Sequence, residues 1–241
     1  DAGVLKGAKM MEVYSLDALV VSGGDGSFKG ARALARIGIP VIGIPGTIDN
    51  EIGCTDYTIG YDTSMNTAMD CIDKLRDTAS SHERCSVIEV MGRRAGYIAL
   101  NVGIATGAEV ILIPEVPFDF DKDVLRVILD GRNKGKRHYI VIVAEGAGNA
   151  TDIAQRIEKQ TGIESRPTIL GHLQRGGSPT LRDRTTASLM GVRAIDCLLE
   201  KRYNRIIVEK NGKITDIDLE EGLAMKKTIP EIEINNAKRL S

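Results

Sequence analysis

Apolar residues along the chain follow two alternating patterns. Short runs of β-branched and aliphatic residues, such as Tyr-Ile-Val-Ile-Val-Ala over residues 139–144, are typical of strands that are covered on both faces in a parallel sheet. Between these runs lie longer stretches in which apolar residues recur every three or four positions, as in amphipathic helices. In residues 66–80, for example, Ala68, Ile72 and Leu75 share one helical face.

These patterns predict strands and helices in alternation. Strands are expected over residues 18–22, 40–44, 86–90, 109–113, 138–144 and 167–170. Helices are expected over residues 26–37, 66–80, from 94 onward, 123–133, 152–160 and 182–199. Two further short runs around Asn211 and Gly212 predict a hairpin. The alternation predicts an α/β fold with doubly wound, mostly parallel, Rossmann-like sheets.

Composition and charge exclude several classes of protein. The 241 residues include 32 Lys and Arg against 33 Asp and Glu, which gives a formal net charge of -1. This balance gives no support to a partner among nucleic acids or membrane surfaces, because such binding draws on a basic excess. Glycine is frequent, at 26 residues, and aromatic residues make up only 4% of the chain. The chain is therefore rich in residues suited to tight backbone turns.

The cysteines predict neither a zinc site nor a disulfide framework. Cys54, Cys71, Cys85 and Cys197 are scattered without CxxC spacing. Because residues 1–10 also lack the apolar stretch of a signal peptide, we expect a reduced, cytoplasmic setting. We expect Cys85 to be a buried structural thiol and not a reactive one.

Candidate chemistry gathers where the predicted strands end. Ligands of open α/β sheets bind at the carboxyl ends of the strands. The loops at these ends combine glycine, which lets a ligand approach backbone amides, with polar or charged residues. They are residues 23–27 (GGDGS), 45–50 (PGTIDN), 91–96 (MGRRAG), 145–146 (EG) and 171–179 (GHLQRGGSP).

The loop at residues 23–27 matches neither a Walker A loop nor the GxGxxG fingerprint. It has two interpretations. It could be a tight strand–helix turn in which Asp25 or Ser27 caps the helix. It could also be a nucleotide-phosphate loop with the Asp25 carboxylate near Mg²⁺, because proteins usually hold this ion with one or two carboxylates plus substrate phosphates.

The acidic and basic residues of the other loops also leave alternatives open. Asp49 could cap the turn after the second strand, or it could act as a general base that accepts a hydroxyl proton during phosphoryl transfer. The basic residues could be solvated surface, or they could be phosphate ligands, for which arginine is well suited. They are Arg84, Arg93, Arg166, Arg175 and His172.

Together, the loops at residues 23–27, 45–50, 91–96 and 171–179 resemble, in order and spacing, the signature loops of bacterial ATP-dependent 6-phosphofructokinases. A GGDG turn also occurs in NAD kinases and diacylglycerol kinases, but these lack the other three loops. The resemblance implies two similar α/β subdomains with the active site between them. It also implies transfer of the γ-phosphoryl of MgATP to the 1-hydroxyl of fructose 6-phosphate, the committed step of glycolysis.

The resemblance implies roles for individual residues. Asp49 would be the base with Thr47 beside it, Arg93 would stabilise charge on the transferring phosphoryl group, and Asp25 would hold Mg²⁺. The ATP phosphates would contact Gly24, Asp25, Gly26 and Ser27. Fructose 6-phosphate would contact Thr47, Ile48, Asp49, Met91, Gly92, Arg93, Glu145, His172 and Arg175. In a homotetramer, Arg84 and Arg166 would reach the substrate of a neighbouring subunit.

A basic cluster over residues 132–137 could be a solvated helix end, which the helix dipole favours. In the resembling family, the positions matching Lys134 and Lys136, together with Arg76 and Glu109, form an effector site. The resemblance therefore implies an allosteric site here for ADP or phosphoenolpyruvate.

Two glycines bear on the phosphoryl donor. Pyrophosphate-dependent relatives typically carry Asp where this chain has Gly26 and Lys where it has Gly46. Those side chains would fill space that the α-phosphate and nucleoside of ATP need. Glycine at both positions therefore implies ATP as the co-substrate, with Mg²⁺ as the cofactor.

Two features depart from the family pattern. Glu51 stands where the family usually has Asp, and nothing before Asp17 resembles the family's first strand and glycine loop. We therefore expect the chain to lack an N-terminal segment, and the alternative function is a sugar-phosphate or effector-binding module without turnover. We expect a nucleotide-binding subdomain over residues 1–60, a sugar-phosphate subdomain over 61–180, and a C-terminal helix and hairpin over 181–241 that return to the first.

Overall fold

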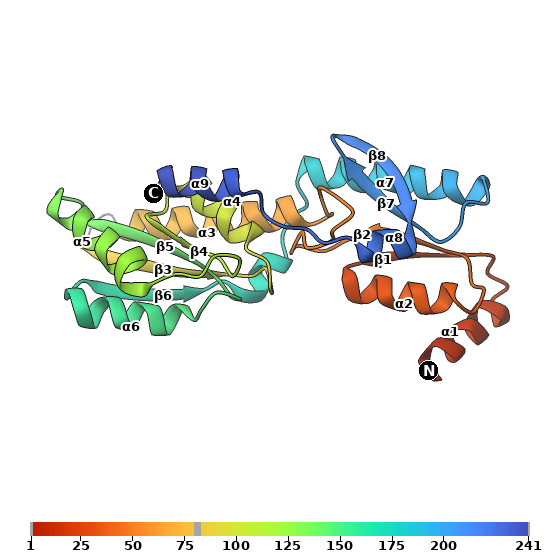
Figure 1. Cartoon of the computed structure of the whole chain (residues 1–241), viewed down its shortest axis with the longest axis horizontal. Coiled ribbons are helices and arrows are strands. Elements are labelled where there is room, and N and C mark those ends of the chain that lie inside the picture. The colour runs from red at the N-terminus through yellow and green to blue at the C-terminus, as the bar shows by residue number, and fades with distance from the viewer. Residues whose placement is uncertain (1, 80–82, 241) are drawn as a thin grey trace. The chain divides into compact units, whose positions relative to one another are not determined.

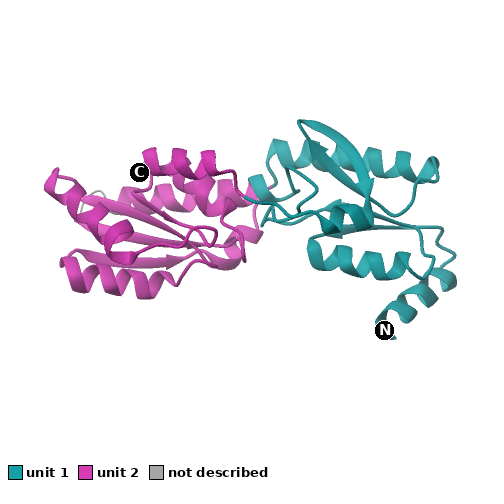
Figure 2. Ribbon diagram, viewed as in Figure 1, with its two compact units in different colours: residues 1–62, 179–228 teal, residues 63–178, 229–241 magenta. Residues whose placement is uncertain are grey.

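The computed structural model describes residues 2–79 and 83–240, which form two compact units. Each unit has its own sheet with helices against it, so the expected α/β fold is confirmed. Figure 2 colours unit 1, which comprises residues 1–62 and 179–228, and unit 2, which comprises residues 63–178 and 229–241.

Unit 1 holds a four-stranded sheet in the order β1-β2-β7-β8 (Figure 1). Strands β1, β2 and β7 are parallel, and β8 returns antiparallel to β7 after the turn at Asn211 and Gly212, where the hairpin is expected. The elements of unit 1 are α1 (Ala2–Val13), β1 (Leu19–Gly23), α2 (Asp25–Ala35), β2 (Val41–Pro45), α7 (Leu181–Leu199), β7 (Arg205–Lys210), β8 (Lys213–Asp218) and α8 (Leu219–Ala224).

Helices α2 and α7 cover different faces of this sheet. Val41 of β2 packs with Phe28 of α2, whereas the next residue, Ile42, packs with Met190 of α7. A strand that is buried on both faces needs apolar residues at successive positions, which explains the sequence of β2. The polar residues that could contact a ligand therefore come after the strand, in the loop that follows Pro45.

Unit 2 holds a parallel sheet in the order β4-β5-β3-β6. Helix α6 and the π-helical turn η1 pack against one face, whereas α3 and α4 lie across the sheet from them (Figure 1). The elements of unit 2 are α3 (Tyr61–Ala79), β3 (Arg84–Val90), α4 (Tyr97–Thr106), β4 (Val110–Leu112), η1 (Phe120–Leu125), α5 (Arg126–Asn133), β5 (His138–Ala144), α6 (Ala150–Thr161), β6 (Glu164–Ile169), the 3₁₀ turn η2 (Gly171–Arg175) and α9 (Glu231–Leu240).

Several boundaries differ from the expected ones. Helix α3 begins at Tyr61 and not at residue 66, while the expected end at residue 80 lies outside the described residues. Helix α4 begins at Tyr97 and not near residue 94, because the backbone of residues 91–96 forms a loop. The helix expected from residue 123 consists of η1 followed by α5.

The C-terminal residues require a correction to the expected division of the chain. We expected all of residues 181–241 to return to the first subdomain, but residues 229–241 belong to unit 2. Helix α9 packs on α4, where Ala237 is buried and Ile234 lines a cavity together with Leu100. Apolar burial against α4 therefore places this short, largely polar helix.

Candidate functional site

The loops that follow β1 and β2 lie side by side in unit 1. The two strands pair in parallel up to Gly23 and Pro45, and the amide of Gly46 donates to the carbonyl of Gly23 at 3.0 Å. A Cβ built on Gly24 would lie 3.5 Å from Cβ of Thr47 and 3.7 Å from Oε1 of Glu51. The structure therefore brings the glycine loop of residues 23–27 together with the loop that carries Asp49.

The loop of Asp49 is fixed by local hydrogen bonds. The amide of Asp49 donates to Oγ1 of Thr47 at 3.2 Å, which closes a tight turn over residues 47–49. Asn50 follows in a left-handed conformation with φ at 50°, and its Nδ2 donates to the carbonyl of Asp56 at 3.3 Å. Asp49 itself is half-buried, so its environment is neither open solvent nor apolar core.

The start of α2 is suited to an anion. Gly24 is the N-cap residue and makes no side-chain capping bond, so the structure contradicts the interpretation in which Asp25 or Ser27 caps the helix. Backbone amides at a helix N-terminus attract phosphate. Gly26 and Ser27 are exposed there, whereas Asp25 is half-buried and pairs with Lys29 at 2.5 Å.

Two carboxylates of unit 1 share one cavity. Asp25 and Glu51 both line a hollow of about 200 Å³, which Phe28 of α2 and Leu223 of α8 also line. Within residues 2–79 and 83–240, no cluster of three or more His, Cys, Asp and Glu could hold a metal ion by itself. Mg²⁺ does not require such a cluster, because one or two carboxylates plus substrate phosphates suffice. The carboxylates of Asp25 and Glu51 are therefore of the chemical type that binds Mg²⁺ together with nucleotide phosphates.

A second group of expected site residues lies at the carboxyl ends of β3 and β5 in unit 2. Oε1 of Glu145 accepts hydrogen bonds from the amides of Gly92 at 3.2 Å and Arg93 at 2.6 Å. Gly92 has φ at 146° and Arg93 has φ at 57°. The Glu145 carboxylate thus holds a sharply turned loop that leaves the Arg93 side chain exposed.

Gln174 connects the loop after β6 to this group. Its Oε1 accepts from the amide of Met91 at 2.8 Å, and its Nε2 donates to Oγ of Ser64 at 3.4 Å. Gln174 is buried, while His172 and Arg175 on the same turn η2 are exposed. Met91, Gly92, Arg93 and Glu145 are thereby brought together, with η2 anchored beside them.

The sequence matches that of a known family along most of the chain. Residues 1–198 match the profile of the family described as Phosphofructokinase. The chain belongs to the phosphofructokinase family. It is 52% identical over 241 residues to the ATP-dependent 6-phosphofructokinase of Clostridium tetani, covering 100% of this chain and 75% of that protein. It is also 52% identical over 226 residues to the ATP-dependent 6-phosphofructokinase 1 of Clostridium perfringens, covering 94% of this chain and 70% of that protein.

Solved phosphofructokinase structures share the fold. The structure of the Pichia pastoris phosphofructokinase in the T-state superposes with a TM-score of 0.85 at 34% identity, covering 99% of this chain. This chain spans only 29% of the Pichia chain, so it corresponds to one part of that protein.

Arg84 and Arg166 of this phosphofructokinase family member lie at another edge of the unit 2 sheet. Arg84 is the first residue of β3, seven residues before Met91, so it lies toward the amino ends of the strands. Nε of Arg84 and Nε of Arg166 each donate to the carboxylate of Glu164 at 2.8 Å. These hydrogen bonds lower the pKa of Glu164 below its ordinary value. Arg84 and Arg166 therefore share the Glu164 carboxylate and lie apart from the group around Glu145.

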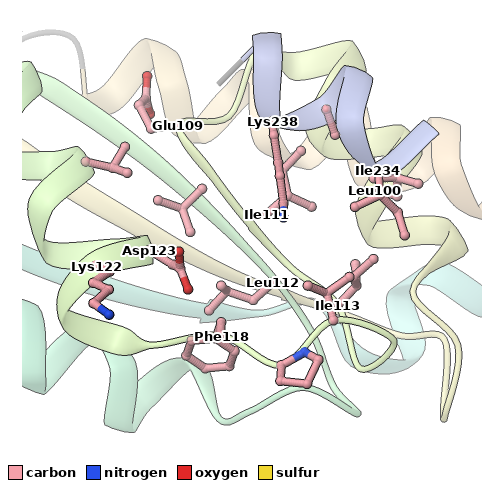
Figure 3. Close-up of a pocket in the computed structure, with 15 residues that line it drawn as sticks. Leu100, Glu109, Ile111, Leu112, Ile113, Phe118, Lys122, Asp123, Ile234 and Lys238 are labelled. Carbon is pink, nitrogen blue, oxygen red and sulfur yellow. The ribbon is translucent and has the colours of Figure 1, made fainter. Parts of the chain in front are cut away.

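The expected effector residues also lie toward the amino ends of the unit 2 strands. Lys136 pairs with Oε1 of Glu109, and a guanidinium nitrogen of Arg76 donates to the carbonyl of Thr106. Lys134 is exposed on the turn after α5. Glu109 also lines a cavity of about 240 Å³ whose walls are mainly aliphatic, as Figure 3 shows. Arg76, Glu109 and Lys136 are thus grouped around the α4–β4 junction.

Two further findings concern the Cys85 thiol and the apolar character of the helices. Cys85 is fully buried, and burial, with a smaller effect of the Glu109 carboxylate, raises the pKa of its thiol to about 12. Cys85 is therefore a buried thiol, as expected, and burial disfavours its reactive thiolate form. Among the described residues, no helix combines the length and apolar character needed to cross a membrane.

Two residues that shape these groups had no role expected from the sequence. Gln174 holds the loop at Met91, and Glu164 holds Arg84 and Arg166. Gln174 stands inside the GHLQRGGSP motif, where a polar residue between two expected ligands could have marked it. Glu164 carried no comparable signal, because only the folded sheet places it between Arg84 and Arg166.

Replacing Gly92 with alanine is expected to destabilise unit 2. A Cβ at Gly92 would lie 2.4 Å from the carbonyl oxygen of Ala95, and φ at 146° is costly for any other residue. Strain and overpacking together should cost about 3 kcal/mol of unfolding free energy, measured by urea denaturation. The control is Gly107→Ala, where φ is 62° and the space is open, with an expected cost of about 1 kcal/mol. Equal losses in the two variants would contradict the role assigned to Gly92.

Proposed function

We propose that this chain transfers the γ-phosphoryl group of MgATP to the 1-hydroxyl of fructose 6-phosphate, giving fructose 1,6-bisphosphate and ADP. The observation that carries the proposal is the contact between the two loops of unit 1. The Gly46–Gly23 hydrogen bond of 3.0 Å places the Asp49 loop against a helix N-terminus suited to phosphate. The ATP-dependent 6-phosphofructokinases of two Clostridium species, each 52% identical, support the same reaction.

In this proposal Asp49 is the general base. Its carboxylate accepts the proton of the 1-hydroxyl while the oxygen forms a bond to the γ-phosphorus and the bond to the ADP oxygen breaks. Gly24, Gly26 and Ser27 offer the amide-rich start of α2 to the nucleotide phosphates. The exposed guanidinium of Arg93 stabilises negative charge on the transferring group, because preorganised donors lower the barrier to such transfers.

The carboxylates of Asp25 and Glu51 would hold Mg²⁺. When bound, the ion would neutralise negative charge on the nucleotide phosphates. Asp25 would exchange its pairing with Lys29, whose side chain is 59% exposed, for the ion. Glu51, with one methylene more than the Asp usual in the family, reaches the same cavity, so its length is compatible with this role.

The remaining expectations concern the assembly and its regulation. Met91, Gly92, Glu145, His172 and Arg175 would bind the sugar phosphate, with Thr47 and Ile48 beside the 1-hydroxyl. Arg84 and Arg166, which already share Glu164, would reach the substrate of a neighbouring subunit in a cytoplasmic homotetramer. Arg76, Glu109, Lys134 and Lys136 would bind an ADP or phosphoenolpyruvate effector. Glycolysis would be the pathway served.

A coupled assay tests the function directly. Purified protein supplied with MgATP and fructose 6-phosphate should form fructose 1,6-bisphosphate and ADP in equal amounts. Calorimetry with each ligand separates this outcome from the binding-module alternative. Binding of fructose 6-phosphate without any product would overturn the kinase proposal.

The donor is expected to be ATP and not pyrophosphate. A Cβ on Gly26 meets no atom within 4 Å, so an Asp there would project into open space beside the proposed phosphate loop. Gly26→Asp should raise KM for ATP roughly tenfold, equivalent to about 1.4 kcal/mol. Gly30→Asp is the control, because Gly30 lies one turn later on α2 in equally open space. Equal values of KM for ATP in the two variants would contradict the assignment. It would also be contradicted if the wild type used pyrophosphate as fast as it uses ATP.

A further inference from the structure

A short segment runs beside the Asp49 loop and extends the sheet of unit 1. Gly46 forms a parallel bridge with Ile59, and the amide of Ile59 donates to the carbonyl of Pro45 at 2.9 Å. Ile59 therefore pairs with the residue that directly follows β2, at the carboxyl end of that strand. We call residues 57–60 the brace.

Thr58 is the point at which the brace contacts the Asp49 loop. Its side chain is fully buried, and its hydroxyl donates to the carbonyl of Thr47 at 2.7 Å. Oγ1 of Thr47 in turn accepts the amide of Asp49 at 3.2 Å. Two successive hydrogen bonds thus run from Thr58 through Thr47 to the backbone of Asp49.

The brace is itself anchored to α7. The hydroxyl of Tyr57 donates to Oδ1 of Asp183 at 2.5 Å, and the amide of Gly60 donates to the same oxygen at 2.8 Å. Tyr57 and Asp183 are each only 2% exposed. Hydrogen bonds to a buried carboxylate are among the stronger ones in proteins, so this anchor holds both ends of the brace.

We propose that Thr58 is a positioning residue that fixes the backbone of Asp49, and that it holds the base in place for phosphoryl transfer. The second half of this statement rests on the proposed function. Without the hydroxyl, the carbonyl of Thr47 loses its partner and the turn over residues 47–49 gains freedom. A displacement of about 1 Å at a reacting group can lower a rate by roughly a hundredfold.

Thr55 provides a matched control in the same loop. Like Thr58 it is 0% exposed, and its hydroxyl donates to a backbone carbonyl, that of Tyr57, at 2.9 Å. It also accepts the amide of Glu209 at 3.0 Å, and its described hydrogen bonds do not reach residues 46–50. Thr55→Val and Thr58→Val therefore remove the same chemical group at the same burial, and only Thr58→Val releases Thr47.

Steady-state kinetics give the first test. Thr58→Val should lower kcat by roughly 10- to 100-fold while KM for ATP changes by less than about threefold. Thr58→Ser keeps the hydroxyl and should restore kcat to within about threefold of wild type. Thr55→Val should lower the melting temperature about as much as Thr58→Val and leave kcat near wild type. An active wild type with equal kcat in Thr58→Val and Thr55→Val would overturn the proposal.

Amide hydrogen exchange, read by mass spectrometry without substrates, gives a test that does not need turnover. Peptides covering residues 45–51 should exchange faster in Thr58→Val, and at the wild-type rate in Thr58→Ser and Thr55→Val. Unchanged protection of residues 45–51 in Thr58→Val would overturn the positioning role. A wild type that forms no fructose 1,6-bisphosphate would instead overturn the proposed function, and the exchange result would still decide whether Thr58 fixes the Asp49 backbone.

Discussion

Asp49→Asn is expected to lower kcat by roughly 10²–10⁴, the usual contribution of a general base. Asparagine keeps the size of the side chain and the hydrogen bond from the backbone amide of residue 49 to Oγ1 of Thr47. It cannot, however, accept the proton of the attacking hydroxyl. The loss should appear in kcat and kcat/KM together, because a base acts in the transition state and adds little to ground-state binding. A coupled spectrophotometric assay at saturating MgATP measures it.

The matched control is Asp130→Asn, on the exposed surface of α5, where the carboxylate is 59% exposed and pairs only loosely with Arg126 at 3.8 Å. Its kcat should equal that of the wild type. If Asp49→Asn turned over at the same rate as Asp130→Asn, Asp49 would not be the base, even if the chain proved to be an active kinase.

Asp216→Ala is expected to cost unit 1 about 3 kcal/mol of unfolding free energy. The Asp216 side chain is 2% exposed and pairs with Arg193, Arg202 and Arg205. Removing one partner of a buried ion pair typically costs 3–5 kcal/mol, and the lower end applies because the guanidiniums are about a third exposed. Chemical denaturation measures the loss. Glu200→Ala removes a 54% exposed partner of Arg202 and should cost at most about 0.5 kcal/mol.

The same carboxylate gives the stability a defined pH dependence. Burial by itself raises the pKa of Asp216, but hydrogen bonds from Arg202, Arg205 and Arg193 outweigh it and bring the pKa to about 2. Because this is below the ordinary value of about 3.9, the stabilisation is complete above pH 4 and is lost as the pH falls toward 2. The difference in stability between wild type and Asp216→Ala should therefore shrink over that interval. A difference that stays constant from pH 5 to pH 2 would contradict the role of the charge.

Much of the fold could be predicted where a single segment decides its own structure. β5 has the expected bounds, His138–Ala144, because a short continuous run of β-branched and other apolar residues is typical of a strand covered on both faces. The start of α3 was missed because its periodic apolar face begins after residue 66, whereas the helix begins at Tyr61. α9 was missed because its helical state depends on packing against α4, which no local pattern records.

The site shows the same division. The glycine loops and Asp49 could be located because they follow predicted strands, and parallel pairing then places β1 and β2 side by side. The side chains that hold these loops could not, because their partners are distant in sequence. Gln174 contacts Met91 across 83 residues, and Asp183 contacts Tyr57 across 126. Such pairs form only in the packed tertiary structure, so no periodic pattern in the sequence predicts them.

The interleaving of the two units sets an order for their completion during synthesis. Unit 1 needs β7 and β8, which end at Asp218, and unit 2 needs α9, which begins at Glu231. When the ribosome has just completed residues 63–178, unit 2 still lacks α9. Unit 1 then still lacks β7 and β8, two of its four strands. Unit 1 can reach its final core only after β8 has emerged, and unit 2 only after α9 has emerged, so the nascent chain carries exposed apolar surface until these elements are made.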